Sequence, residues 1–162
     1  MSNNTKKTIA LSGGFDPIHV GHLQLFRDAS EYGDVVVILN SDEWLARRKG
    51  FHFMSWKERK VIINSIPWVS SVMKVDDRYG DVHKALKELK PDYFGNGGSR
   101  KKSNTPESEI KCCNDIGVTM VWNLGENAMQ DGNILTIQDR CVKEMIKQMK
   151  VFDKFEQNLE KK

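Results

Sequence analysis

The stretch Ser12-Gly13-Gly14-Phe15-Asp16-Pro17-Ile18-His19-Val20-Gly21-His22 decides the fold, because an apolar run leads into it and a helix-forming run leads out of it. The apolar run is residues 8–11, and the helix-forming run is residues 23–29. This order predicts a strand, a glycine turn and the start of a helix. Glycines let the backbone approach a ligand closely, and the free N–H groups at a helix start attract anions. The stretch therefore predicts a phosphate-binding turn.

The two histidines of this stretch are the first candidate site residues. His19 and His22 stand three residues apart, so they share one face once the helix begins. A lone histidine is usually a structural residue, whereas two at this spacing, directly after a strand and a Gly-Gly turn, indicate a site. Their imidazoles, the free N–H groups and Gly21 between them would form the floor of a phosphate site.

Strand-like and helix-like segments alternate along the rest of the chain. The expected strands are residues 34–40, 69–75, 93–96 and 118–122, and the expected helices are residues 43–49, 55–66, 81–89, 105–117 and about 134–159. This alternation predicts one Rossmann-like α/β domain over residues 8–162, in which a five-stranded parallel sheet has helices on both faces and a C-terminal helix follows. Residues 1–7 would be a polar tail. Ligands of such sheets bind at the carboxyl ends of the strands, where the glycine-rich turns converge.

One helix start is marked by a capping box, in which Ser55 is followed three residues later by Glu58. The helix that it opens stops before Pro67. It carries the apolar residues Val61, Ile62, Ile63 and Ile66.

Composition excludes several classes of protein. The 162 residues include 25 basic and 22 acidic side chains, and a net charge of +3 is too small to indicate nucleic-acid binding. No apolar run approaches the length of a membrane span, and no signal region follows the N-terminus. Three cysteines, two of them adjacent at Cys112 and Cys113, fit neither a disulfide framework nor a zinc pattern. Free thiols predict a cytoplasmic location.

The segment Gly13–His22, GGFDPIHVGH, resembles the HxGH signature of the nucleotidyltransferase superfamily. Within it the chain is cytidylyltransferase-like, and is similar to glycerol-3-phosphate cytidylyltransferase and the heptose-phosphate adenylyltransferase domain from about Ile9 to about Gly98. The resemblance implies transfer of a nucleoside monophosphate from a triphosphate to a small phosphorylated acceptor, with release of pyrophosphate. CTP is the favoured donor, and ATP with a sugar phosphate is the alternative. Mg²⁺ would arrive with the triphosphate.

The resemblance also implies roles for individual residues in the first half of the chain. His19 and His22 would be catalytic, because donors aimed at the developing phosphoryl charge are usually the largest catalytic term. The turn around them would bind the nucleotide through Ser12, Gly13, Gly14, Phe15, Asp16 and Gly21. Asp16 is the one acidic residue of the turn, and would either meet the metal ion or brace the turn.

A basic segment gives a second match to the relatives. Either Arg48 or Lys49 would contact the phosphates, unless the run is a solvated helix end. Arg59 would bind the nucleotide or form a surface ion pair. Asp42 and Arg47 would bind the acceptor, with a helix cap as the other role open to Asp42.

The later matches are weaker. Gly97, Gly98 and Ser99 would bind the nucleotide, with Ser99 where relatives carry aspartate, and the following Arg100-Lys101-Lys102 would meet either a nucleotide or solvent. A turn before the last helix would supply Asn133, Ile134 and Thr136, although the hydroxyls typical of relatives are mostly absent. These two departures leave a non-catalytic nucleotide-binding module as the alternative function.

The last helix has an apolar stripe that predicts a homodimer contact, with packing inside the monomer as the alternative. The stripe consists of Val142, Met145, Ile146, Met149, Phe152 and Phe155.

Overall fold

The computed structural model describes residues 6–98, 100–125, 143–147 and 149. The chain forms two compact units, Met1–Ala128 and Met129–Lys162. In the second unit, residues 143–147 and 149 are helical. Most of the expected last helix lies outside the described residues, and with it Val142, Phe152 and Phe155 of the expected dimer stripe. The other stripe residues, Met145, Ile146 and Met149, are described and exposed. Four of the expected nucleotide-binding residues, Ser99, Asn133, Ile134 and Thr136, also lie outside the described residues.

The first unit is built on one parallel sheet with the strand order β3-β2-β1-β4-β5. The strands are β1 (Thr8–Gly13), β2 (Asp34–Leu39), β3 (Val69–Lys74), β4 (Tyr93–Gly97) and β5 (Thr119–Leu124). The prediction of a five-stranded parallel sheet is therefore confirmed. From β1 the chain adds β2 and β3 on one side, and then returns to add β4 and β5 on the other side. The switch point lies beside β1, and in sheets of this kind it marks the ligand crevice.

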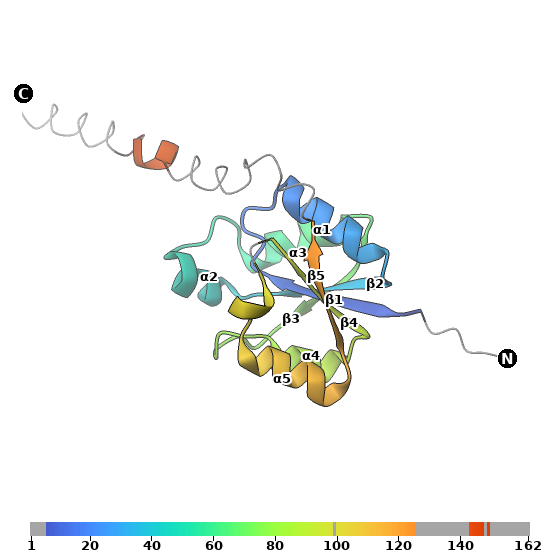
Figure 1. Ribbon diagram of the computed structural model, residues 1–162. Coiled ribbons are helices and arrows are strands. Elements are labelled where there is room, and N and C mark those ends of the chain that lie inside the picture. The colour runs from blue at the N-terminus through green and yellow to red at the C-terminus, as the bar shows by residue number, and fades with distance from the viewer. Residues whose placement is uncertain (1–5, 99, 126–142, 148, 150–162) are drawn as a thin grey trace, which may run out of the picture. The chain divides into compact units, whose positions relative to one another are not determined.

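Helices cover both faces of the sheet, as predicted: α1 and α3 lie on one side and α4 and α5 on the other (Figure 1). They are α1 (Val20–Ser30), α2 (Asp42–Lys49), α3 (Trp56–Asn64), α4 (His83–Leu89) and α5 (Glu107–Ile116), with a short 3₁₀ turn, η1 (Lys102–Asn104). Two of the starts are set by serine caps. The Ser41 hydroxyl accepts the N–H of Trp44, and the predicted capping box of Ser55 and Glu58 is present.

Each face of the sheet has its own apolar core, because successive strand residues point to opposite faces. On β1, Ile9 and Leu11 pack with residues of α1 and α3, whereas Ala10 packs with residues of α4 and α5. The β2 strand contributes to both cores, since Val37 and Ile38 are each fully buried. The helices described by the structure include none long and apolar enough to cross a membrane.

Candidate active site

The turn between β1 and α1 is held in place by Asp16. The carboxylate is 1% exposed and accepts two backbone N–H groups, from Phe53 at 2.7 Å and from Met54 at 2.9 Å. These contacts join the turn to the loop that precedes α3. Of the two roles expected for Asp16, the described contacts are those of a brace.

The two histidines lie together at the start of α1. Their rings are stacked, with centroids 3.8 Å apart and an angle of 17° between the planes. His19 is the N-cap residue of the helix, and its backbone N–H is 3.3 Å from Nδ1 of His22. The ring of Phe15 meets that of His22 edge-on at 5.0 Å. The prediction that both imidazoles share one face of the helix is confirmed.

Both rings are neutral at pH 7. Burial, assisted by the nearby His19 and Lys49, lowers the pKa of His22 to about 3. Burial and Lys49 also lower the pKa of His19. Because Nδ1 of His22 accepts a hydrogen bond, the proton of the neutral ring is on Nε2, which is then a donor. Among the described residues, Nδ1 of His19 is buried without a hydrogen-bond partner.

The neighbouring cation is Lys49. Its Nζ donates to the backbone carbonyl of Asp16 at 2.7 Å, and burial lowers the pKa of its ammonium group. Arg48, the other expected phosphate contact, is exposed like Lys49, but its guanidinium lies over the ring of Trp44 at 5.5 Å. The structure therefore brings Lys49, rather than Arg48, to the histidines.

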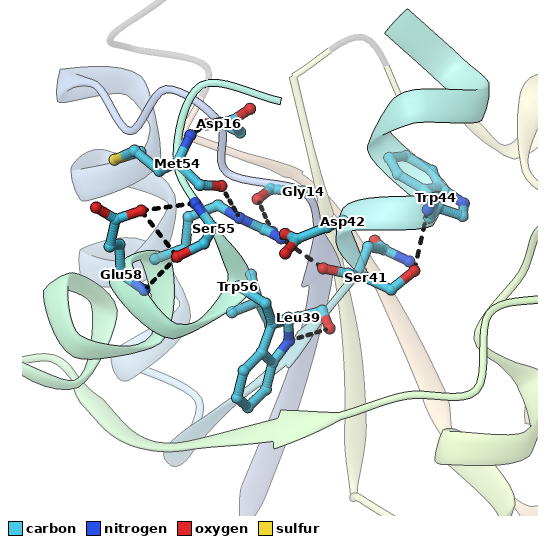
Figure 2. Close-up of polar contacts among 12 residues, drawn as sticks. Gly14, Asp16, Leu39, Ser41, Asp42, Trp44, Met54, Ser55, Trp56 and Glu58 are labelled. Atoms are coloured by element: carbon cyan, nitrogen blue, oxygen red, sulfur yellow. Dashed lines mark hydrogen bonds and ion pairs between the residues drawn. The ribbon is translucent and has the colours of Figure 1, made fainter. Parts of the chain in front are cut away.

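Arg59 is fully buried beneath the turn, so the surface ion pair considered for it is wrong. Its Nε donates to the carbonyl of Met54 at 3.1 Å. Nη1 donates to the carbonyls of Gly14 at 2.6 Å and Asn40 at 3.0 Å, and Nη2 to the carboxylate of Asp42 at 2.6 Å. Figure 2 labels three of these acceptor residues, Gly14, Asp42 and Met54, which come from three segments of the chain. The guanidinium therefore links the loops that surround the site through its hydrogen bonds. Its expected contact with the nucleotide remains a prediction.

The two residues expected to bind the acceptor, Asp42 and Arg47, have different surroundings in the structure. Asp42 pairs with Arg59, whereas Arg47 lines a cavity of about 660 Å³ beside the carboxyl end of β3. Arg47 also donates from Nη2 to the backbone carbonyl of Asp77 at 3.0 Å. The lining consists of Ser41, Glu43, Arg47, Lys74, Val75, Asp76, Asp77 and Arg78.

Asp77 is a residue of this cavity that the sequence analysis missed. Its side chain is 3% exposed and accepts the backbone N–H and the hydroxyl of Ser41, each at 2.7 Å, and the amide of Asn40 at 3.1 Å. The available signal was its place shortly after the third strand, where ligand-binding loops of parallel sheets lie.

A second cavity, of about 210 Å³, lies at the carboxyl ends of β1 and β4. It is lined by Leu11, Ser12, Leu25, Gly95, Asn96, Gly97 and Arg100. Two expected nucleotide-binding residues, Ser12 and Gly97, are therefore brought together here. A Cβ on Gly97 would stand 2.4 Å from the carbonyl oxygen of Leu124, so the close approach of the strands requires glycine. Gly98 follows in a left-handed conformation, with a φ of 64°.

The described residues include no group of three or more His, Cys, Asp or Glu side chains placed to hold a metal ion. Both carboxylate oxygens of Asp16 are engaged by N–H groups. The described His, Cys, Asp and Glu side chains therefore form no cluster of metal ligands.

A parallel sheet whose strand order reverses beside β1, with paired imidazoles at the start of the first helix, defines a Rossmann-like domain. The chain belongs to the cytidylyltransferase-like family, whose model matches residues 10–119. Membership places it among the nucleotidyltransferases, as the resemblance implied.

Relatives with different substrates match the chain. FAD synthase of Pyrococcus abyssi is 33% identical over 115 residues, which are 69% of this chain and 71% of the relative. Ethanolamine-phosphate cytidylyltransferase of Dictyostelium discoideum is 34% identical over 76 residues, 44% of this chain and 21% of the relative. A lipopolysaccharide core biosynthesis protein of Thermoplasma volcanium shares the fold, with a TM-score of 0.59 at 24% identity, over 73% of this chain and 94% of that one.

Proposed function

We propose that this protein transfers a nucleoside monophosphate from a nucleoside triphosphate to a small phosphorylated acceptor. An oxygen of the acceptor phosphate attacks the α-phosphorus, and the bond from that phosphorus to the pyrophosphate leaving group breaks. The protein supplies no nucleophile, so catalysis depends on positioning and on neutralising charge. The observation that carries the proposal is the pair of neutral, stacked imidazoles at the start of α1.

In this proposal each group of the site has one task, which its described contacts support. Nε2–H of His22 is fixed as a donor by the hydrogen bond at Nδ1, and would donate to the α-phosphoryl oxygens. His19 lies parallel to it and Lys49 adds a positive charge nearby. Donors fixed before the reaction lose little free energy to reorganisation, which is why such groups contribute strongly to catalysis. Mg²⁺ would come bound to the triphosphate.

The acceptor's body would occupy the 660 Å³ cavity next to Arg47. Its lining residues carry both charge signs, with the Ser41 hydroxyl and three carboxylates among the groups present. These groups favour a small acceptor that carries hydroxyl groups, such as a sugar or polyol phosphate.

We favour CTP as the donor, because the middle segment of the chain resembles that of the cytidylyltransferase. The match to FAD synthases supports ATP as the second candidate. A cytoplasmic location is part of the proposal, and the two described cysteines, Cys112 and Cys113, are buried free thiols, consistent with it.

The test is pyrophosphate release from CTP, ATP, GTP and UTP with a panel of polyol and sugar phosphates. We expect release with one triphosphate and one class of acceptor, and a fall of about a hundredfold or more in kcat for His22→Ala. His52→Ala is the matched control, because His52 is exposed. If no combination gives pyrophosphate while calorimetry shows nucleotide binding, the protein is a binding module and the proposal is wrong.

A further inference from the structure

A buried carboxylate outside the proposed machinery needs an explanation. Glu109 on α5 is 1% exposed. Its Oε1 accepts the backbone N–H of Val82 at 3.1 Å, and its Oε2 accepts Nη1 of Arg100 at 2.9 Å. A carboxylate is costly to bury unless it is paired and hydrogen-bonded, so this one depends on Arg100.

Arg100 connects that carboxylate to the smaller cavity. It lines the cavity with Ser12 and Gly97, and its side chain is 34% exposed. Among the described side-chain contacts, Nη1 alone is used, by Glu109. The guanidinium is planar and carries five donors in a fixed fork. Anchoring one nitrogen on a buried group therefore orients the remaining donors at the edge of the cavity.

This cavity adjoins the histidine site. Leu25 lies one helical turn after His22 on α1, and Ser12 directly precedes the glycine turn. The side chains of Leu11 and Leu25 give the cavity an apolar wall, and Ser12, Asn96 and Arg100 give it polar groups. Apolar walls with a few oriented polar groups are typical of small-molecule sites. A flat aromatic base attached to a triphosphate held at the histidines fits this description.

We propose that Arg100, oriented by Glu109, recognises the base of the donor nucleotide and favours cytosine over adenine. This inference rests on the proposed function. Two parallel donors of a guanidinium match two neighbouring acceptors on one edge of a base. Cytosine presents such a pair at O2 and N3. Adenine presents its N1 and N7 acceptors each beside the amino group, which is a donor. Glu109 is thus a positioning residue, and Arg100 a specificity-determining residue.

The experiment compares Arg100→Gln, Arg100→Lys and Glu109→Gln by steady-state kinetics with CTP and ATP. For Arg100→Gln we expect KM for CTP to rise and the ratio of kcat/KM for CTP over ATP to fall by about tenfold or more, equivalent to about 1.4 kcal/mol. KM for the acceptor should stay unchanged. Arg100→Lys keeps the charge but not the fork, so it should not restore the ratio. Glu109→Gln should lower the ratio by a smaller factor, and exposed Lys111→Gln on α5 is the control.

The outcomes separate the two proposals. An active wild type whose CTP-to-ATP ratio is unchanged in Arg100→Gln would overturn this inference and leave the proposed function intact. Full rescue by Arg100→Lys would also overturn it, because charge alone would then suffice. If the wild type releases no pyrophosphate, calorimetric titration of CTP and ATP makes the same comparison through Kd. If Glu109→Gln does not fold, Arg100→Gln decides.

Discussion

Replacing Arg59 by methionine tests whether a buried guanidinium holds the site together. The side chain is fully buried, and its donors serve three backbone carbonyls and the carboxylate of Asp42. Methionine keeps much of the length and the apolar stem but has no donor. The variant therefore removes all four hydrogen bonds while filling most of the space.

The expected loss follows from the partners left behind. The carbonyls of Gly14 and Asn40 would each be left without the guanidinium, at about 1–3 kcal/mol for a buried unsatisfied group. Losing one partner of a buried ion pair typically costs about 3–5 kcal/mol, but Asp42 is 29% exposed and water can partly replace the guanidinium. We expect Arg59→Met to lower the free energy of unfolding by about 4 kcal/mol. Domains of this size are stable by about 5–15 kcal/mol, so the variant would be marginal.

Urea unfolding followed by circular dichroism measures this loss. Lys57→Met is the matched control, because it replaces an exposed cation on the same helix and should change stability by less than about 0.5 kcal/mol. Arg59→Lys keeps the charge but cannot reach all four acceptors, so an intermediate loss is expected. A loss below about 1 kcal/mol for Arg59→Met would refute the bracing role. Weakened nucleotide binding in a fully stable Arg59→Lys would instead indicate direct contact with the nucleotide.

Three further predictions concern the same site. Because the pKa of His22 is lowered to about 3 in the folded state, protons bind better to the unfolded chain below the ordinary pKa of 6.5. Unfolding free energy should therefore fall by up to about 2 kcal/mol from pH 7 to pH 5, and His22→Gln should flatten that slope in urea titrations. Lys49→Ala should lower kcat at least about ten times more than Arg48→Ala, and equal effects would contradict the placement of Lys49. Asp16→Asn should lose about 1–3 kcal/mol of stability, with the Mg²⁺ concentration for half-maximal rate unchanged; a shift in that concentration would identify Asp16 as a metal ligand.

The fold could be predicted from sequence because its signals are local. The run over residues 35–39 is continuously apolar, as expected for a parallel strand covered on both faces, and β2 occupies residues 34–39. The histidine pair could be predicted equally well, because a spacing of three residues at a helix start fixes their relative position whatever packs around them. The roles of Asp77 and Glu109 could not be predicted from the sequence in this way. The backbone N–H groups that these carboxylates accept lie 36 and 27 residues away, at Ser41 and Val82, so only the folded chain shows these contacts.

The burial of Arg59 could have been predicted from sequence, because a local signal placed this residue on the inner face of its helix. The capping box fixes the start of α3, and with it the face that each later residue occupies. Arg59 lies four residues before Ile63, so the two share the buried face, whereas the equally apolar Val61 is 66% exposed. A cationic side chain on the core-facing side of a helix needs hydrogen-bond acceptors, and the apolar side chains of the core provide none. At the carboxyl edge of a parallel sheet those acceptors are loop carbonyls, and a buried arginine there fixes the loops that surround the ligand.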